Sequence, residues 1–256
     1  LKKINFFYGS NGSGKTTLGK IIPCYTREIV AQTEKSYDEK INMTDVFYWT
    51  SFFQYQAFLT KYPQIINRIH VTGLGKTYTQ LQCDLTGIYQ KHNLKTVLAA
   101  LHQLQKIGYD IDGSAIAQGL KTVKQTTGLM GRWQVLQQQP LMVADTGHNV
   151  NGLEYVLAQI NQQTYTQLHV VIGMVRDKDI TKVLKLLPTS AKYYFTQAQI
   201  PRALPANELA QMAKDFGLLG DVFANVTEAK QAAMHQAQPT DMIFIGGSTF
   251  IVAEAL

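Results

Sequence analysis

The stretch LMVADTGHNVNGLEYVLAQINQQTYTQLHVVIG, residues 141–173, contains the repeating unit of the fold. Its two ends, LMVAD (141–145) and LHVVIG (168–173), are apolar runs without polar alternation, as expected for strands that helices cover on both faces. Between them, apolar side chains recur at helical spacing: Leu153, Val156, Leu157 and Ile160. A strand, a helix and a second strand in this order predict a parallel pair joined by a crossover helix.

The same alternation continues to the end of the chain. Further strand-like runs are YYFT (193–196), VFANV (222–226) and MIFIG (242–246). Helical patterns lie between them around residues 180–187, 209–213 and 229–233. The C-terminal half is therefore predicted to be an α/β domain with a mostly parallel, doubly wound sheet.

Parallel sheets bind ligands beyond the carboxyl ends of their strands, so four loops are candidates for a site. They are DTGHN (145–149), GMVRDKD (173–179), TQAQIPR (196–202) and GGSTF (246–250). In the first of them, Asp145 could accept a hydrogen bond from a ribose hydroxyl, and His148 precedes a helix N-terminus that favours anions. Two alternatives stay open. Asp145 could only cap its strand while His148 lies on the surface, or LMVAD could be the acidic metal-binding strand of a phosphate-loop ATPase.

The N-terminal stretch GSNGSGKTT, from Gly9 to Thr17, predicts a phosphate-binding loop. It follows a strand-like run at 3–8, precedes a helical run at 16–22, and has the register G-x-x-x-x-G-K-T from Gly9 to Thr16. Lys15 would reach the terminal phosphates, and Thr16 would ligate Mg²⁺.

Residues 24–80 have no assigned role. The aromatic-rich segment Asp45 to Tyr62 suits either a buried helix or an irregular strand pair, and GLGKT (73–77) is interpreted as a turn. After it, apolar spacing predicts a helix over residues 94–104 with a stop at Gly108, and a second helix over 114–123.

The composition excludes some classes of protein but does not identify the function. The chain has 256 residues, is 45% hydrophobic and 16% charged, and carries a formal net charge of +6, which is ordinary for a globular protein. Its two cysteines, Cys24 and Cys83, lie far apart and are expected to be reduced thiols. Without a run of ~20 apolar residues, a basic stripe or a recognition-helix pattern, we expect neither a membrane span nor nucleic-acid binding. We expect a cytoplasmic monomer whose first residues are missing, since the sequence opens on Leu1.

Five motifs together resemble one enzyme family. GIYQKHNLKTVLAAL (87–101), TGLMGRWQ (127–134), VADTGHN (143–149), GMVRDKD (173–179) and FIGGS (244–248) occur in the order and at the spacing of folylpolyglutamate synthases, also called dihydrofolate synthases, of the Mur ligase superfamily. The resemblance covers about residues 80–256. It implies an incomplete phosphate-loop-type ATPase domain over residues 1–137 and a Rossmann-like C-terminal domain over residues 138–256.

The resemblance also implies site residues. Asn93 would lie by the adenine of ATP, although Tyr89 replaces the family's histidine. Arg132, in the linker between the family's domains, would contact a phosphate, as a guanidinium with several fixed donors can. Asp145 would hold the ribose, and His148 would line the cleft for the amino-acid substrate. Residues 177–179 match a segment near that cleft.

The glycine loop matches the family only in part. Gly9, Asn11, Gly12 and Gly14 are shared with the family's ATP-binding loop, whereas Lys15 lies two places later than the family's lysine. The surrounding sequence resembles phosphate-loop ATPases of the recombination and ABC-like type.

The family's reaction is a ligation that uses ATP and Mg²⁺. ATP phosphorylates a folate or dihydropteroate carboxylate, and the amine of L-glutamate attacks the acyl phosphate. Lys15, Arg132 and His148 are the expected catalytic residues. The alternative, of another class, is a phosphate-loop ATPase module with a C-terminal domain that only binds a partner.

Overall fold

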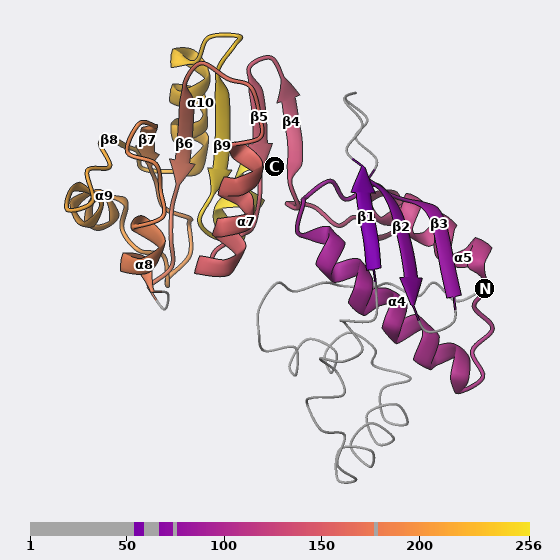
Figure 1. Ribbon diagram of the computed structural model, residues 1–256. Helices are drawn as coiled ribbons and strands as arrows, with labels where there is room; N and C mark the ends of the chain where they lie inside the picture. Colours follow the sequence, from indigo (N-terminus) through magenta and orange to yellow (C-terminus); the bar gives the residue numbers. More distant parts are fainter. Residues whose placement is uncertain (1–53, 59–66, 74–75, 177–178) are drawn as a thin grey trace. The chain divides into compact units, whose positions relative to one another are not determined.

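The computed structural model describes residues 54–58, 67–73, 76–176 and 179–256, with side-chain positions from Leu81 onward. The chain divides into two compact units, Leu1–Leu129 and Met130–Leu256 (Figure 1). The glycine loop, with Gly9, Asn11, Gly12, Gly14, Lys15 and Thr16, lies outside the described residues, as does Cys24.

The described part of the first unit is an antiparallel sheet with helices packed on it. The sheet has the order β1-β2-β3. Its elements are β1 (Gln54–Phe58), β2 (Asn67–Gly73), β3 (Lys76–Cys83), α4 (Gln90–Lys106), α5 (Gly113–Lys121) and α6 (Val123–Thr127). Apolar side chains from the end of β3 and from α4 and α5 form one core cluster, which includes Leu81, Leu98 and Leu120. Cys83 is a buried free thiol of this core, and burial raises its pKa to about 11.

The two segments without clear predictions belong to this sheet. Within the aromatic-rich stretch, residues 54–58 form the strand β1, so the described part of the stretch is a strand and not a helix. The turn predicted at GLGKT falls where β2 ends at Gly73 and the antiparallel β3 begins at Lys76. The two expected helices are α4 and α5, and Gly108, with φ 97°, follows the end of α4 as predicted.

The second unit is built on a six-stranded sheet with the order β4-β5-β9-β6-β7-β8. All neighbouring strands are parallel except β4, which pairs antiparallel with β5. The strands are β4 (Gln134–Gln138), β5 (Leu141–Ala144), β6 (Leu168–Ile172), β7 (Lys192–Phe195), β8 (Gly220–Val222) and β9 (Met242–Gly246). The predicted mostly parallel sheet is confirmed.

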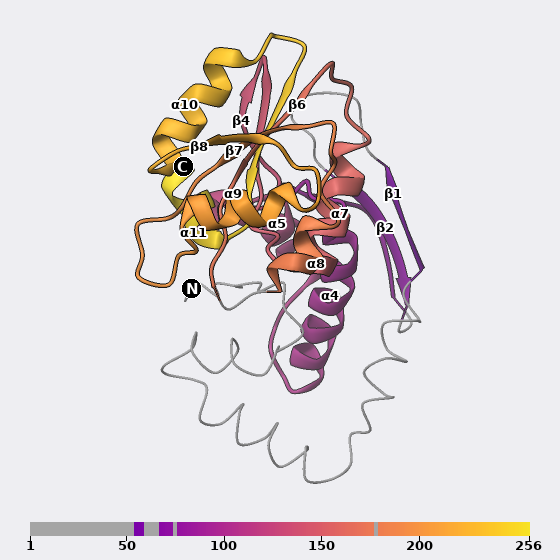
Figure 2. The ribbon, with the colours of Figure 1, turned by 90° about the vertical axis from the view of Figure 1, so that its left-hand side faces the viewer.

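Helices cover both faces of this sheet, as the apolar strands predicted. They are α7 (Val150–Ile160), α8 (Ile180–Leu184), α9 (Ala206–Lys214), α10 (Val226–Gln236) and α11 (Thr249–Ala255). Side chains of α7, α8 and α9 share one core cluster with Val170 and Phe244, whereas α10 and α11 share a second cluster with Val171 and Ile245. Alternate residues of β5, β6, β7 and β9 thus enter opposite cores, and Figure 2 shows α7 and α10 on opposite sides of the strands.

Two strands differ from their predictions. The run VFANV (222–226) was predicted as a strand, but β8 spans Gly220–Val222 and Val226 already begins α10. Gly220 explains the shift, because a Cβ there would lie 1.9 Å from the carbonyl oxygen of Tyr193 on β7. The strand β4 was not predicted at all; its sequence QVLQQ lies mostly half-buried at the sheet edge.

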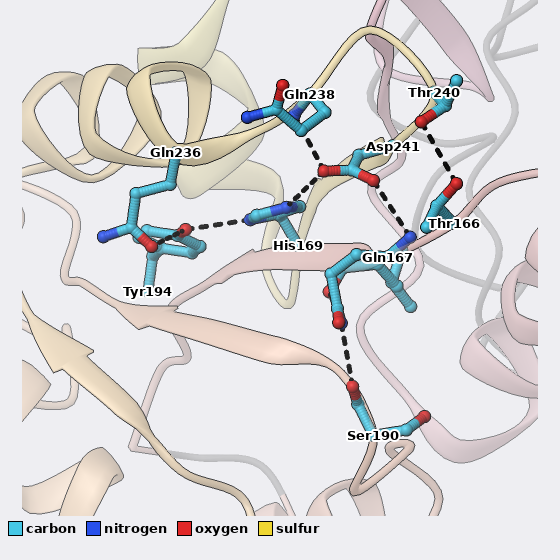
Figure 3. A network of polar contacts seen from close by, with 10 residues as sticks. Thr166, Gln167, His169, Ser190, Tyr194, Gln236, Gln238, Thr240 and Asp241 are labelled. Atoms are coloured by element: carbon cyan, nitrogen blue, oxygen red, sulfur yellow. Dashed lines mark hydrogen bonds and ion pairs between the residues drawn. The ribbon is translucent and has the colours of Figure 1, made fainter.

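A buried polar network joins the amino ends of β6 and β9 (Figure 3). His169, on β6, is fully buried; its Nδ1 lies 2.9 Å from the Tyr194 hydroxyl and its Nε2 lies 3.3 Å from a carboxylate oxygen of Asp241. Asp241 also accepts hydrogen bonds from the backbone N–H groups of Gln167 and Gln238. Burial lowers the pKa of His169, and this outweighs the opposite effect of the Asp241 carboxylate.

In the parts of the chain that the structure describes, no helix combines the length and the apolar character needed to cross a lipid bilayer.

Candidate functional site

The four loops singled out from the sequence follow β5, β6, β7 and β9, which are parallel and adjacent in the order β5-β9-β6-β7. Backbone hydrogen bonds join the first residue of two loops to the neighbouring strand: the N–H of Asp145 donates to Ile245 of β9, and the N–H of Thr196 donates to Ile172 of β6. The N–H of Gly173 also donates to the carbonyl oxygen of Gly246 at 3.5 Å. The carboxyl edge of the sheet therefore brings these loops together, as the parallel topology predicted.

Glycines allow the loops to approach one another closely. A Cβ on Gly173 would lie 2.5 Å from both the carbonyl oxygen of Thr196 and Cδ1 of Ile251. Gly247, with φ 94°, would place a Cβ 2.5 Å from the carbonyl oxygen of Gly173. Any larger residue at these positions would push the loops apart.

The DTGHN loop connects β5 to α7. The Asp145 carboxylate is 2% exposed, and its two oxygens accept hydrogen bonds from the backbone N–H groups of Gly147, at 2.7 Å, and Trp133, at 2.6 Å. The half-buried His148 contacts the carbonyl oxygen of Thr146 through Nδ1 at 2.9 Å. Asn149 caps α7 by accepting a hydrogen bond from the N–H of Gly152. Asp145 therefore holds this loop in shape, as a strand-end cap does, and its roles as a ribose contact or as a metal ligand stay predictions.

A pocket of about 300 Å³ lies between the beginnings of α7 and α8. Its lining residues are His148, Asn149, Val150, Asn151, Asp179, Lys182 and Val183. Lys182 forms an exposed ion pair with Asp179, with 2.7 Å between Nζ and Oδ2, and this contact lowers the pKa of the Asp179 carboxyl. The pocket thus combines an ammonium group and an imidazole at the N-terminal end of α7, an arrangement that suits a carboxylate ligand.

Arg132 lies at the start of the second unit, just before β4. It is half-buried, and its neighbours in the chain are Gly131, with φ 69°, and Trp133, with φ 47°. The structure thus places Arg132, Asp145 and His148 in one unit, with Asp145 hydrogen-bonded to the residue after Arg132.

Asn93 belongs to the first unit. It lies in the first turn of α4, and its side-chain amide donates to Oε1 of the buried Gln90 at 2.8 Å. Tyr89, which stands where the family has histidine, directly precedes this helix, and its ring packs closely over Gly87.

Two further residues were not predicted from the sequence. Lys182 lies in a helical pattern that was given no functional role, and Trp133 lies in a motif in which only Arg132 received a role. The positive φ of Trp133 has no signal in sequence, because bulky residues rarely adopt it. Within the described ranges, no group of three or more His, Cys, Asp or Glu side chains could hold a metal ion. Thr16, the predicted Mg²⁺ ligand, lies outside these ranges, so that assignment stays a prediction.

Comparison with known proteins agrees with the topology of the second unit. Residues 131–249, less than half of the chain, match the family described as Mur ligase, glutamate ligase domain. Beyond this domain, the chain is similar to folylpolyglutamate and dihydrofolate synthases of the Mur ligase superfamily, as the five motifs predicted.

One relative is a probable bifunctional folylpolyglutamate synthase/dihydropteroate synthase of Haloferax volcanii, 29% identical over 68% of this chain and 20% of its own length. A solved structure of Escherichia coli FolC in complex with DHPP and ADP is 26% identical, with a TM-score of 0.63 over 78% of this chain and 44% of its own.

A second structure is the bifunctional folylpolyglutamate synthase/dihydrofolate synthase of Yersinia pestis, complexed with AMPPNP and a Mn ion. It is 29% identical, with a TM-score of 0.60 over 73% of this chain and 42% of its own. The chain therefore spans less than half the length of each of these proteins.

Proposed function

We propose that this protein acts as an ATP-dependent ligase that adds L-glutamate to a folate or dihydropteroate carboxylate through an acyl phosphate. The observation that carries the proposal is the pocket at the N-terminal end of α7, within the residues that match the glutamate ligase domain of Mur ligases. The relatives described above support the same reaction class, and their complexes contain DHPP and ADP in one case and AMPPNP and a Mn ion in the other.

In this proposal the pocket receives L-glutamate. The N-terminal end of α7 favours a carboxylate, Lys182 would turn from its exposed ion pair with Asp179 to bind it, and His148 lines the pocket as a hydrogen-bonding group. Arg132 contacts the phosphates of ATP together with Lys15. The contact of Asn93 with the adenine ring and the Mg²⁺ contact of Thr16 complete the assignment and stay predictions, as do the cytoplasmic location and the monomeric state. The ribose contact that the family resemblance implies for Asp145 also stays a prediction, and a purely structural role of this buried carboxylate is the alternative to it.

The chemistry proceeds in two transfers. A carboxylate oxygen of the folate substrate attacks the γ-phosphorus of ATP, which forms the acyl phosphate and releases ADP. The amine of glutamate then attacks the acyl carbon, the amide bond forms, and inorganic phosphate leaves as the amine loses its protons. Positioning and neutralisation of phosphate charge are what such transfers require from a protein, and Mg²⁺ supplies part of that neutralisation when bound.

The test is ADP release by the full chain with ATP, Mg²⁺ and dihydropteroate or tetrahydrofolate, with and without L-glutamate. We expect release that depends on both substrates and is lost in Lys182→Ala at low glutamate but not in Lys185→Ala, which removes an exposed lysine outside the pocket. The second arm replaces L-glutamate by D-glutamate. Equal release with and without glutamate would contradict the ligase assignment, and equal release with either enantiomer would contradict the assignment of L-glutamate as the specific substrate.

A second candidate function rests on the glycine loop. Its register from Gly9 to Thr16 is that of a general phosphate-loop ATPase, with the second unit as a binding domain. This candidate predicts ATP hydrolysis that folate and glutamate leave unchanged and that Lys15→Ala abolishes. The assay above separates the two functions.

A further inference from the structure

The backbone on both sides of Arg132 is left-handed. Gly131 has φ 69° and Trp133 has φ 47°. Glycine adopts such a conformation without cost, but a bulky residue with a Cβ does so only where its surroundings hold it there. Trp133 is the one residue other than glycine with a positive φ among those that the structure describes.

Two contacts hold Trp133 in this conformation. Its side chain is 2% exposed and belongs to the core cluster that α7, α8 and α9 share. Its backbone N–H donates to Oδ2 of Asp145 at 2.6 Å, twelve residues further along the chain. A hydrogen bond to a carboxylate is stronger than one to a neutral acceptor, and more so where water is excluded.

Hydrogen bonds also hold the backbone of Gly131, on the N-terminal side of Arg132. Its carbonyl oxygen accepts a hydrogen bond from the N–H of Thr146 at 3.0 Å, and its own N–H donates to the side chain of Gln134 at 2.7 Å. A Cβ at this position would lie 2.8 Å from side-chain atoms of both Thr146 and Val252. With both neighbours fixed, the direction in which Arg132 leaves the backbone is fixed as well.

The same carboxylate also shapes the loop that carries His148. The second oxygen of Asp145 accepts a hydrogen bond from the N–H of Gly147 at 2.7 Å. One buried group therefore joins the segment of Arg132 to the loop of His148, both within the second unit.

From these contacts we propose that Asp145 is a positioning residue, which holds Trp133 in its left-handed conformation and so sets the orientation of Arg132. The proposal rests on the proposed function in one respect, namely that Arg132 contacts the phosphates of the nucleotide. It differs from the ribose contact that the family resemblance assigns to Asp145, since a positioning residue acts through Arg132 and a ribose ligand acts alone.

The first test needs no activity. Amide hydrogen exchange is followed by NMR in the wild-type chain, in Asp145→Asn and in the matched control Asp241→Asn. Asp241 is also a buried carboxylate that accepts two backbone N–H groups, but it lies at the amino edge of the sheet. In the wild type the Trp133 amide should be protected, and Asp145→Asn should accelerate exchange at Trp133 and Gly147 by about tenfold or more relative to Asp241→Asn.

An unprotected Trp133 amide in the wild-type chain would overturn the proposal, and this measurement stands even where the variants do not fold. Equal acceleration at Trp133 in both variants would overturn it too, because it would mark a general loss of stability.

The second test separates positioning from ribose contact. Binding of ADP and of 2′,3′-dideoxy-ADP is measured by calorimetry for the wild type, Asp145→Asn, Arg132→Ala and the double variant. Positioning predicts that Asp145→Asn weakens both nucleotides by the same factor, and that the double variant binds no more weakly than Arg132→Ala alone.

A loss in Asp145→Asn that is confined to ADP, or that adds fully to the loss in Arg132→Ala, would overturn the proposal in favour of a ribose contact. If the wild-type chain binds neither nucleotide, the proposed function fails, and the exchange experiment alone decides whether Asp145 holds Trp133.

Discussion

Replacing Tyr194 by Phe removes one hydroxyl from the buried network at the amino edge of the sheet. That hydroxyl contacts Nδ1 of His169 at 2.9 Å and donates to the side chain of Gln236 at 2.9 Å. Gln236 is exposed and can turn to water, whereas His169 is fully buried and cannot. We therefore expect Tyr194→Phe to leave the buried Nδ1 of His169 without this hydrogen bond, at a cost of about 1–3 kcal/mol in the free energy of unfolding.

The adjacent residue gives a matched control. Tyr193 is equally buried on the same strand, but it faces the other core cluster, and its hydroxyl donates to the carbonyl oxygen of Pro188 at 2.7 Å. Pro188 is half-buried, so Tyr193→Phe should cost only about 0.5–1.5 kcal/mol, the net value of an ordinary hydrogen bond.

Urea unfolding measures both variants. In a Trp49→Phe background Trp133 is the single tryptophan, so its fluorescence reports on the second unit. The slope of the unfolding free energy against urea concentration should be the same in the wild type and both variants. The urea concentration at the midpoint of unfolding should fall further for Tyr194→Phe than for Tyr193→Phe. Equal losses, or a larger loss for Tyr193→Phe, would refute the reasoning. In a His169→Phe background the imidazole is absent, so Tyr194→Phe should lower the free energy of unfolding by less than it does in the wild-type background.

Three more predictions concern pH, the glycine-packed edge and the helix cap. Lowering the pH below about 6.5 should reduce the free energy of unfolding, because burial keeps the pKa of His169 below its value in the unfolded chain, and the unfolded chain then binds more protons. Urea midpoints at pH 7 and pH 5 measure this loss. If His169→Phe lost as much stability between the two pH values as the wild type, the prediction would be contradicted. Gly173→Ala should cost about 1–3 kcal/mol, since the new methyl group meets the carbonyl oxygen of Thr196. Thermal unfolding tests it beside Gly119→Ala, where a Cβ meets nothing within 4 Å and no loss is expected. Asn149→Ala should cost about 1 kcal/mol by removing the cap of α7, whereas Asn149→Asp should keep most of it; equal losses in the two variants by urea unfolding would exclude a capping role.

The central strands could be predicted because a strand that is buried on both faces has an apolar residue at nearly every position. MIFIG and LHVVIG are apolar at nearly every position, and they form β9 and β6, which are fully buried. His169, the polar residue inside the second run, does not disturb the pattern, because its partners Tyr194 and Asp241 satisfy it from distant parts of the chain.

The edge strands β4 and β8 lack this apolar pattern. All three residues of β8 are exposed, and β4 is rich in glutamine, so neither shows the apolar run of a central strand. Their places depend on hydrogen bonds to a neighbouring strand and, for Gly220, on the absence of a side chain. A pattern based on burial cannot detect either cause.

The candidate site was predictable in its loops but not in its contacts. Parallel strands dictate that Asp145 and His148 lie at the carboxyl edge, whichever sequence surrounds them. The direction of the Asp145 carboxylate, toward the N–H of Trp133, depends on a left-handed residue whose side chain type gives no hint of it. Tertiary contacts therefore decide the details of the site.

The position of β9 affects how the domain can be made. It comes last in sequence among the six strands of this sheet, yet it lies between β5 and β6 at the centre of the sheet. A growing chain that has not yet released residues 242–246 from the ribosome can form only the β4–β5 hairpin and the group β6-β7-β8, each with an open apolar edge. Completion of the sheet must therefore follow synthesis of all five other strands, and a stop codon before Met242 would leave two separate sheets that expose edges prone to aggregation.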